Sequence, residues 1–124
     1  MNIPQDLMYS DTHEWVKQTD GGALVGLTDF AQASLGDIVF VNLCVAGDKV
    51  VSGEVLGDVE SIKAVSDIIS PVSGVVARVN EHVLERPELI NDSPYEAWLI
   101  EIEQITDKSA LISADEYETL IADQ

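Results

Sequence analysis

The chain has 124 residues, which is enough for one compact domain and too few for two domains of ordinary size. Six basic residues face 23 acidic ones, and the formal net charge of −17 argues against partners that need clustered Lys and Arg, namely nucleic acid and anionic membrane surfaces. The single cysteine, Cys44, excludes an internal disulfide and a multi-cysteine metal site, and no apolar run is long enough to span a bilayer.

The chain begins with a segment that reads as a β-hairpin. Residues 1–6 lack a basic start followed by an apolar stretch, so they predict no secretory signal, and no Arg-rich transit peptide is visible. Residues 13–17 form a short strand-like run, residues 19–22 (Thr-Asp-Gly-Gly) are a turn signal, and residues 23–27 are the returning strand.

A short helix and a further strand are predicted next. Asp29, three residues before Gln32, resembles a capping box, and Gly36 stands where a helix would stop. We therefore expect a helix within residues 28–35. Residues 37–43 are rich in β-branched and aromatic side chains, which favours a strand.

The middle of the chain consists of short apolar pieces separated by turn formers. Gly53 and Gly57 interrupt the pieces before Lys63, and Pro71 and Gly74 interrupt those after it. Many short strands with turn residues between them indicate an all-β sandwich or barrel.

The last third predicts a loop, a strand and a helix. Pro87 and Pro94 bracket residues 88–93, which we expect to be an irregular loop, and residues 97–102 form another predicted strand. A capping box at residues 113–116 predicts a C-terminal helix over about residues 113–123. Its apolar face is formed by three residues at helical spacing, Tyr117, Leu120 and Ile121.

Lys63 lies at the centre of the most regular part of the sequence. Gly53 precedes it by ten residues and Gly74 follows it by eleven, which predicts a hairpin over about residues 53–74 with Lys63 at or near its tip. The lysine amine can form a stable amide with the carboxyl group of a cofactor, and a hairpin tip would make it accessible to a modifying enzyme. A lysine at a turn is also an ordinary feature of protein surfaces, and spacing alone does not decide between the two interpretations.

The residues around Lys63 resemble a known modification motif. Residues 60–67, Glu-Ser-Ile-Lys-Ala-Val-Ser-Asp, closely resemble the lipoylation motif of glycine cleavage system H proteins. The resemblance covers nearly the whole chain and includes residues 13–16, 26–32, 35–41, 70–74, 79–80, 87–91 and 94–95. It implies a mainly β fold, a barrel-sandwich hybrid of the lipoyl/biotinyl-like hairpin type, with a short internal helix and a C-terminal helix in a single domain of residues 1–124.

The same resemblance implies a carrier without catalytic activity of its own, with lipoate joined to Lys63 by a lipoate-attaching enzyme. In that family the P protein, a pyridoxal-phosphate enzyme, decarboxylates glycine and passes the aminomethyl group to the lipoyl arm. The T protein moves the one-carbon unit to tetrahydrofolate, and the L protein, a dihydrolipoamide dehydrogenase, reoxidises the arm. We expect a monomer, because such a carrier makes transient contacts with several enzymes. The expected location is cytoplasmic, or the mitochondrial matrix if a transit peptide has been removed.

Four further residues match the family positions near which the loaded arm folds back: Thr12, Glu14, Ser34 and Asp67. The loaded arm ends in a cationic amine, for which carboxylates and hydroxyls are suitable acceptors. Glu14 and Asp67 match the family pattern well, whereas Ser34 stands where some members have histidine. The alternative is that Glu14 and Asp67 are ordinary surface carboxylates, or that the Asp67 side chain closes a turn. The acidic surface likewise either attracts basic patches on partners or serves solubility alone.

Other functions receive less support. Biotinyl domains have methionine on both sides of the lysine, whereas Ile62 and Ala64 occupy those places here. An H-like protein that relays lipoyl groups to other complexes stays open as an alternative. We find no nucleophile–base motif, no phosphate loop and no cluster of metal ligands, so we predict neither an enzyme nor a metal site. The segment before Trp98 lacks a glycine that is common in the family, which leaves the conformation of that loop open.

Overall fold

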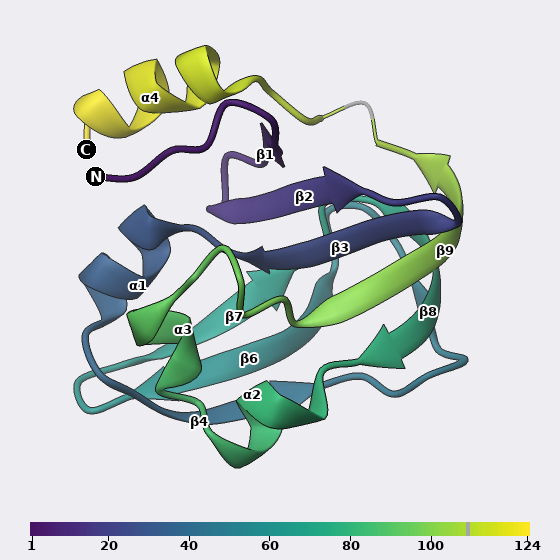
Figure 1. The fold of residues 1–124 in the computed structure, drawn as a ribbon, viewed down its shortest axis with the longest axis horizontal. Coiled ribbons are helices and arrows are strands. Elements are labelled where there is room, and N and C mark those ends of the chain that lie inside the picture. The colour runs from purple at the N-terminus through teal and green to yellow at the C-terminus, as the bar shows by residue number, and fades with distance from the viewer. Residues whose placement is uncertain (109) are drawn as a thin grey trace.

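The computed structural model describes residues 1–108 and 110–124, and within them the chain folds into two antiparallel sheets with short helices at their margins (Figure 1). The larger sheet contains, in spatial order, β1 (Met8–Tyr9), β2 (Glu14–Gln18), β3 (Gly22–Leu27), β9 (Ile100–Asp107), β8 (Ser73–Val79) and β5 (Lys49–Val50). The smaller sheet contains, in spatial order, β4 (Ile38–Leu43), β6 (Val55–Ser61) and β7 (Val65–Ile69). The mainly β fold is confirmed, and the sheets do not close into a barrel in the described part of the chain.

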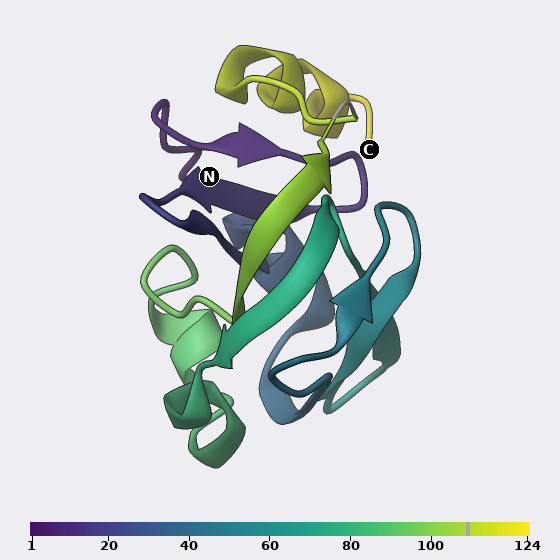
Figure 2. The same cartoon turned by 90° about the vertical axis from the view of Figure 1, so that its right-hand side faces the viewer.

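The main core lies between the two sheets. Alternate residues of β9, Ile100 and Ile102, are fully buried, and Val59 and Ile68 of the smaller sheet belong to the same cluster. Full burial of such a side chain stabilises the fold by roughly 1.5–3 kcal/mol, so the sheets are held together mainly by apolar contact. Figure 2 shows β8 and β9 passing diagonally between the N-terminal strands and the smaller sheet.

A second, smaller core lies beneath the C-terminal helix α4 (Ala114–Ala122). The rings of Tyr9 and Tyr117 are stacked with their centroids 4.7 Å apart, and Trp15 is buried in the same cluster. Both halves of the predicted capping box at Ser113 and Glu116 are present. The C-terminal helix is therefore confirmed, and it covers the N-terminal strands (Figure 1).

Helix α1 (Asp29–Leu35) is also confirmed, but its predicted capping box is wrong. Thr28 is the N-cap, because its side-chain oxygen accepts a hydrogen bond from the backbone N–H of Ala31 at 3.1 Å. Asp29 is the first helical residue, and its carboxylate accepts a hydrogen bond from the Gln32 amide at 2.7 Å. Gly36 ends the helix with a φ of +78°, a conformation that favours glycine.

The predicted irregular loop at residues 88–93 is wrong. Leu89–Asp92 form a short helix, α3, and it follows another, α2 (Glu81–Glu85), that the sequence analysis did not predict. Pro87 precedes the first turn of α3, where a proline is well tolerated because the first backbone N–H groups of a helix have no partner inside it. The proline that indicated a loop therefore stands at a helix start.

The strand predicted over residues 97–102 begins later than expected and extends further. It is β9, which starts at Ile100 and runs to Asp107. The backbone N–H of Ala97 donates to the carbonyl of Ser93 at 2.9 Å, so Ala97 still belongs to the turn after α3. Among the described residues, no helix is both long and apolar enough to cross a membrane.

Candidate functional site

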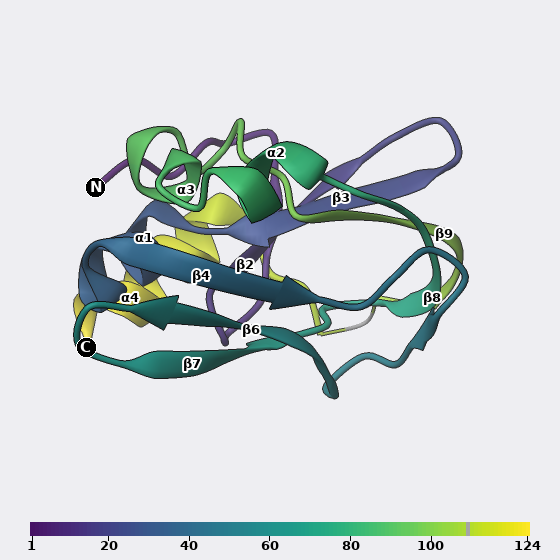
Figure 3. The same cartoon turned by 90° about the horizontal axis from the view of Figure 1, so that it is seen from below.

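The hairpin predicted around Lys63 is formed by β6 and β7. These strands pair antiparallel with Glu60 opposite Val65, and the three residues between them form a tight turn (Figure 3). The backbone N–H of Ser61 donates to the carbonyl of Ala64 at 2.8 Å. The Ser61 hydroxyl oxygen accepts from the backbone N–H groups of Lys63 at 3.3 Å and of Ala64 at 3.1 Å. A serine hydroxyl thus closes the turn that presents Lys63.

The tip of this hairpin is attached to the neighbouring segment. The backbone N–H of Ile62 donates to the carbonyl of Asp37 at 3.0 Å. The side chain of Lys63 lies beside the end of α1, since its Cε would be 3.5 Å from a Cβ placed on Gly36. Lys63 itself is exposed, and neither of the two ion pairs found among the described residues involves it. Its amine is therefore accessible from solvent while the backbone that carries it is held in place.

Asn91 of α3 is a positioning residue that the sequence analysis missed. Its amide nitrogen donates to the carbonyl of Gly36 at 2.9 Å and to the Gln32 side chain at 3.0 Å. Its amide oxygen accepts from the backbone N–H of Ile38 at 2.9 Å. Asn91 therefore joins the end of α1 to the start of β4, the two places that the tip around Lys63 touches. Asn91 lies in residues 87–91, one of the segments that resemble the family, and this was the sequence signal that could have identified it.

Glu14 is buried, with 1% of its surface exposed, so its alternative interpretation as a surface carboxylate is wrong. Its Oε1 accepts hydrogen bonds from the hydroxyl of Ser10 at 2.7 Å and from the hydroxyl of Thr12. Its Oε2 accepts from the backbone N–H of Ile69 at 3.4 Å, which links β2 to the end of β7. Burial raises the pKa of Glu14 from 4.5 to about 7, and the hydrogen bonds from Thr12, Ser10 and Ile69 oppose that rise.

The turn that carries Thr12 and Glu14 is held from the other side by α4. His13 has a φ of +75°, and its Nδ1 lies 2.8 Å from the hydroxyl of Tyr117. The same hydroxyl lies 2.8 Å from the hydroxyl of Thr28, the N-cap of α1. Burial lowers the pKa of His13, which favours its neutral form in this contact. Ser10 and Tyr117 are thus two further positioning residues that the sequence analysis did not identify.

Asp67 and Ser34 stand apart from this hydrogen-bonded group. Asp67 is exposed on β7, directly opposite Asp58 of β6, and it precedes Ile69 by two residues. Ser34 is exposed on α1. Within residues 1–108 and 110–124, no hydrogen bond joins either of them to Thr12 or Glu14. The structure therefore brings two of the four predicted arm-contacting residues together and leaves the other two on neighbouring elements.

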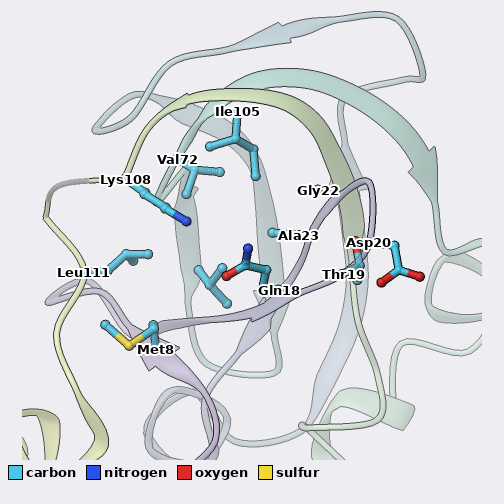
Figure 4. A pocket seen from close by; sticks show the side chains of 11 residues that line it. Met8, Gln18, Thr19, Asp20, Gly22, Ala23, Val72, Ile105, Lys108 and Leu111 are labelled. Carbon is cyan, nitrogen blue, oxygen red and sulfur yellow. The ribbon is translucent and has the colours of Figure 1, made fainter.

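A cavity of about 420 Å³ lies elsewhere, between the β2–β3 hairpin and the segment that follows β9 (Figure 4). Its walls are largely apolar, with Val72 and Ile105 among them, and the side chains of Gln18 and Lys108 point into it (Figure 4). None of the predicted site residues lines it. The β2–β3 turn and the Lys63 turn lie at opposite ends of the molecule (Figures 1 and 3).

Comparisons with known proteins agree on one family. The family model described as glycine cleavage H-protein matches residues 7–124 of this chain. A glycine cleavage system H protein of Lachnoclostridium phytofermentans is 52% identical over 122 residues, which cover 98% of this chain and 96% of the relative. One of Listeria monocytogenes is 48% identical over 124 residues, with 98% and 99% covered.

A solved structure extends the similarity to three dimensions. The crystal structure of a glycine cleavage system H protein from Mycobacterium marinum is similar to this chain with a TM-score of 0.92 and 40% sequence identity. The match covers 97% of this chain and 99% of the other. The similarity of sequence and the similarity of fold therefore extend over the same, nearly complete length.

Proposed function

Since this chain belongs to the glycine cleavage H-protein family, we propose that it is the lipoyl carrier of a glycine cleavage system, with the lipoyl group joined to Lys63. The observation that carries this proposal is the exposed lysine in the closed turn between β6 and β7. An amine in that place can enter the active site of a modifying enzyme without any rearrangement of the fold. The relatives described above are all glycine cleavage system H proteins, which favours this role over the H-like relay.

Lys63 takes part in the modification as a nucleophile. Its Nζ attacks the activated carboxyl carbon of lipoate on the lipoate-attaching enzyme, the activating group leaves with the electron pair, and the nitrogen loses a proton. The product is an amide, which carries no charge. The lysine fits this reaction because no carboxylate among the described residues forms an ion pair with its amine.

The attached lipoyl group supplies a disulfide that accepts the aminomethyl group of glycine. We propose that the chain itself contributes no catalytic residue to this chemistry, which belongs to three partners. These are the P protein, which decarboxylates glycine, the T protein, an aminomethyltransferase, and the L protein, a dihydrolipoamide dehydrogenase. The contribution of the chain is to hold Lys63 in a place that each partner can reach.

Four residues are proposed to receive the loaded arm: Thr12, Glu14, Ser34 and Asp67. A lysine side chain extended by a lipoyl chain spans about 14 Å from Cα to its ring, at about 1.25 Å per bond along an extended chain. Because a strand rises about 3.3 Å per residue, Asp67 lies at most about 13 Å and Ile69 at most about 20 Å along the chain from Lys63. The loaded arm, with the ring opened and the aminomethyl group added, is about 6 Å longer by the same length per bond, so Asp67 and the Glu14 carboxyl beside Ile69 are within its range.

Glu14 is suited to receive a cation. Its pKa of about 7 leaves it partly protonated near neutral pH, and an ammonium group beside it would favour the charged form. The hydroxyls of Ser10 and Thr12 already stabilise that form through hydrogen bonds to Oε1. We propose that Glu14 becomes fully ionised when the loaded arm is present and is only partly ionised near neutral pH when the arm is absent.

The proposed function is tested by glycine-dependent exchange of labelled bicarbonate with purified P protein. The lipoylated chain should support exchange, and Lys63→Arg, which keeps the positive charge but whose guanidinium is not nucleophilic and cannot form the amide with lipoate, should not. Lys49→Arg is the matched control, because Lys49 is exposed on β5 outside the hairpin. Lipoylated protein that supports no exchange would refute the glycine cleavage role and favour the relay.

A further inference from the structure

The outer face of the smaller sheet presents large apolar side chains close to Lys63. Four of them are strongly exposed, with exposed fractions of 54%, 49%, 71% and 66% for Val39, Phe40, Ile62 and Val65. The strand register places Phe40 opposite Glu60 and Glu60 opposite Val65, so the two apolar side chains flank one carboxylate in a single row. Figure 3 shows β4, β6 and β7 side by side, and no labelled element crosses in front of them.

A β-bulge creates part of this surface. The pairing of β4 with β6 shifts between Ile38 and Phe40, since Ile38 lies opposite Ser61 and Phe40 lies opposite Glu60. Val39 is thus an extra residue on β4. Two successive residues of a regular strand point to opposite faces, but here Val39 and Phe40 are both exposed while Ile38 and Val41 are both buried. The bulge therefore turns one more apolar side chain outward, at the end of β4 next to the tip.

Acidic side chains continue the same face. Asp58 of β6 and Asp67 of β7 lie directly opposite each other, and Asn42 of β4 donates a hydrogen bond to Asp58 at 2.9 Å. Like charges directly opposite in a sheet are destabilising. Neither carboxylate takes part in the ion pairs found in the described part of the chain. A cation supplied by a partner would relieve this repulsion.

We propose that this face, formed by Val39, Phe40, Ile62, Val65, Asp58 and Asp67, is the docking surface for the lipoate-attaching enzyme. The inference rests on the proposed function of Lys63. The unmodified lysine side chain spans only about 6 Å from Cα to Nζ, at about 1.25 Å per bond, so its modifying enzyme must cover the surface next to the tip. An enzyme that acts on the completed arm can remain roughly 14 Å away, by the same estimate of length per bond.

The apolar and acidic side chains of this face indicate what the surface of the lipoate-attaching enzyme must present. It presents an apolar patch that covers Phe40 and Val65, beside Lys or Arg side chains that face Asp58 and Asp67. Apolar contacts at the centre of an interface contribute most of its affinity, while charges at the rim mainly affect the association rate. The two parts of the surface therefore have separable effects on the modification reaction.

The test is the initial rate of lipoylation of the apo protein by its lipoate-attaching enzyme, with lipoate and ATP, followed by intact mass. We expect Phe40→Thr and Val65→Thr each to lower kcat/KM by about tenfold, through KM, because truncation of a central apolar contact weakens docking and leaves the chemistry unchanged. Threonine is β-branched, which suits a strand, and both replaced side chains are exposed, so folding should be unaffected. Far-UV circular dichroism and the unfolding midpoint check this.

The matched controls are Val45→Thr and Val55→Thr. These side chains are exposed by 63% and 57%, but Val45 follows the far end of β4 and Val55 begins β6, away from the tip. They should leave kcat/KM unchanged. Asp58→Asn should reduce the loss of rate that added salt causes in the unaltered protein.

Three outcomes are decisive. Lower kcat/KM in Phe40→Thr and Val65→Thr with unchanged controls supports the docking surface. Equal kcat/KM in all four variants overturns it while leaving Lys63 as the lipoyl site. Unmodified wild-type protein in an assay that modifies another lipoyl carrier overturns the proposed function and the docking surface with it.

Discussion

Glu14 is a carboxyl group kept away from water by the turn that precedes β2. Three donors, the hydroxyls of Ser10 and Thr12 and the backbone N–H of Ile69, satisfy its oxygens. Burial nevertheless outweighs them and raises its pKa from 4.5 to about 7. A buried carboxyl with a perturbed pKa that is close to an exposed strand is a typical feature of a functional site, and here it lies in reach of the arm proposed for Lys63.

This pKa predicts a pH dependence of stability. Below pH 4.5 the carboxyl is protonated in both the folded and the unfolded chain, whereas between pH 4.5 and about 7 the folded chain retains a proton that the unfolded chain has lost. The free energy of unfolding should therefore fall by roughly 3 kcal/mol as the pH rises through this window. Urea unfolding at pH 5 and pH 8 measures it.

The matched variant for this measurement is Glu14→Gln, which has nearly the same shape and no titrating proton. Other carboxyl groups also titrate in this range, so the difference between the wild type and the variant isolates Glu14. The difference in unfolding free energy should change between pH 5 and pH 8, with the variant gaining relative to the wild type. A constant difference would show that Glu14 has an ordinary pKa.

At the scale of elements, the hairpin depends on a glycine that allows β6 to approach β4 closely. A Cβ added to Gly57 would overlap the backbone carbonyl oxygen of Asn42. That carbonyl belongs to the paired strand, so it cannot move without disturbing the register between β4 and β6.

Gly57→Ala is therefore expected to lower the free energy of unfolding by more than about 2 kcal/mol, because a backbone clash belongs to the strongly destabilising class of substitutions. Gly21→Ala is the control, since a Cβ there has no heavy atom within 4 Å, and it should change stability by less than about 0.5 kcal/mol. Equal stability of the two variants in a urea titration would contradict the close approach.

Helix α4 depends on its first turn. Ser113 accepts a hydrogen bond from the backbone N–H of Glu116 at 3.2 Å, and the Glu116 carboxylate accepts from the backbone N–H of Ser113 at 3.1 Å. Ser113→Ala should lower the free energy of unfolding by about 1 kcal/mol. Thr119→Ala, in the exposed middle of the same helix, should have a smaller effect. A thermal unfolding series of the two variants checks this order, and the reverse order would show that the cap does not contribute.

The elements that the sequence predicted well depend on local signals. The turn around Lys63 follows from turn formers on both sides of it, and α4 follows from a capping box within four residues. The wrong prediction of a loop at residues 88–93 arose because the same residue type can indicate two different structures. A proline breaks a helix in its interior and is well placed at its start, so Pro87 before α3 was interpreted as part of a loop.

The site was predicted as a set of residues but not as an arrangement. The resemblance predicted Lys63 as the attachment site and Thr12, Glu14, Ser34 and Asp67 as contacts of the arm, but it gave no indication that Glu14 is buried. The contacts of Asn91 with Gly36 and Ile38 join residues 55 and 53 positions apart, and a pattern of neighbouring residues contains no signal for such pairs. Long-range hydrogen bonds of this kind are the part of the site that the sequence did not indicate.

At the scale of the whole molecule, the two sheets share one core, since Val25 and Ile102 of the larger sheet pack in one cluster with Val59 and Ile68 of the smaller. We propose on this basis that residues 1–124 fold as a single unit. The charge of this unit is strongly unbalanced, at −17. The two ion pairs of the described residues, Arg78 with Glu101 and Arg86 with Glu88, leave most carboxylates without a cationic partner.

This imbalance predicts that salt stabilises the protein. Raising NaCl from about 0.01 M to about 0.2 M shortens the Debye length from about 30 Å to about 7 Å, which screens the repulsion among carboxylates in the folded chain. The unfolding midpoint should rise by several degrees, and the use of KCl should give the same result. A fall in the midpoint would indicate that attractive charge pairs dominate the surface.

The central claim is that Lys63 is the site of lipoyl attachment, and intact mass tests it most directly. Apo protein incubated with lipoate, ATP and a lipoate-attaching enzyme should gain the mass of one lipoyl group, and peptide mapping should place that group on Lys63. Lys63→Arg should gain none, while Lys49→Arg should be modified like the wild type. An adduct on Lys63→Arg, or wild-type protein that stays unmodified beside a fully modified reference carrier, would contradict the claim.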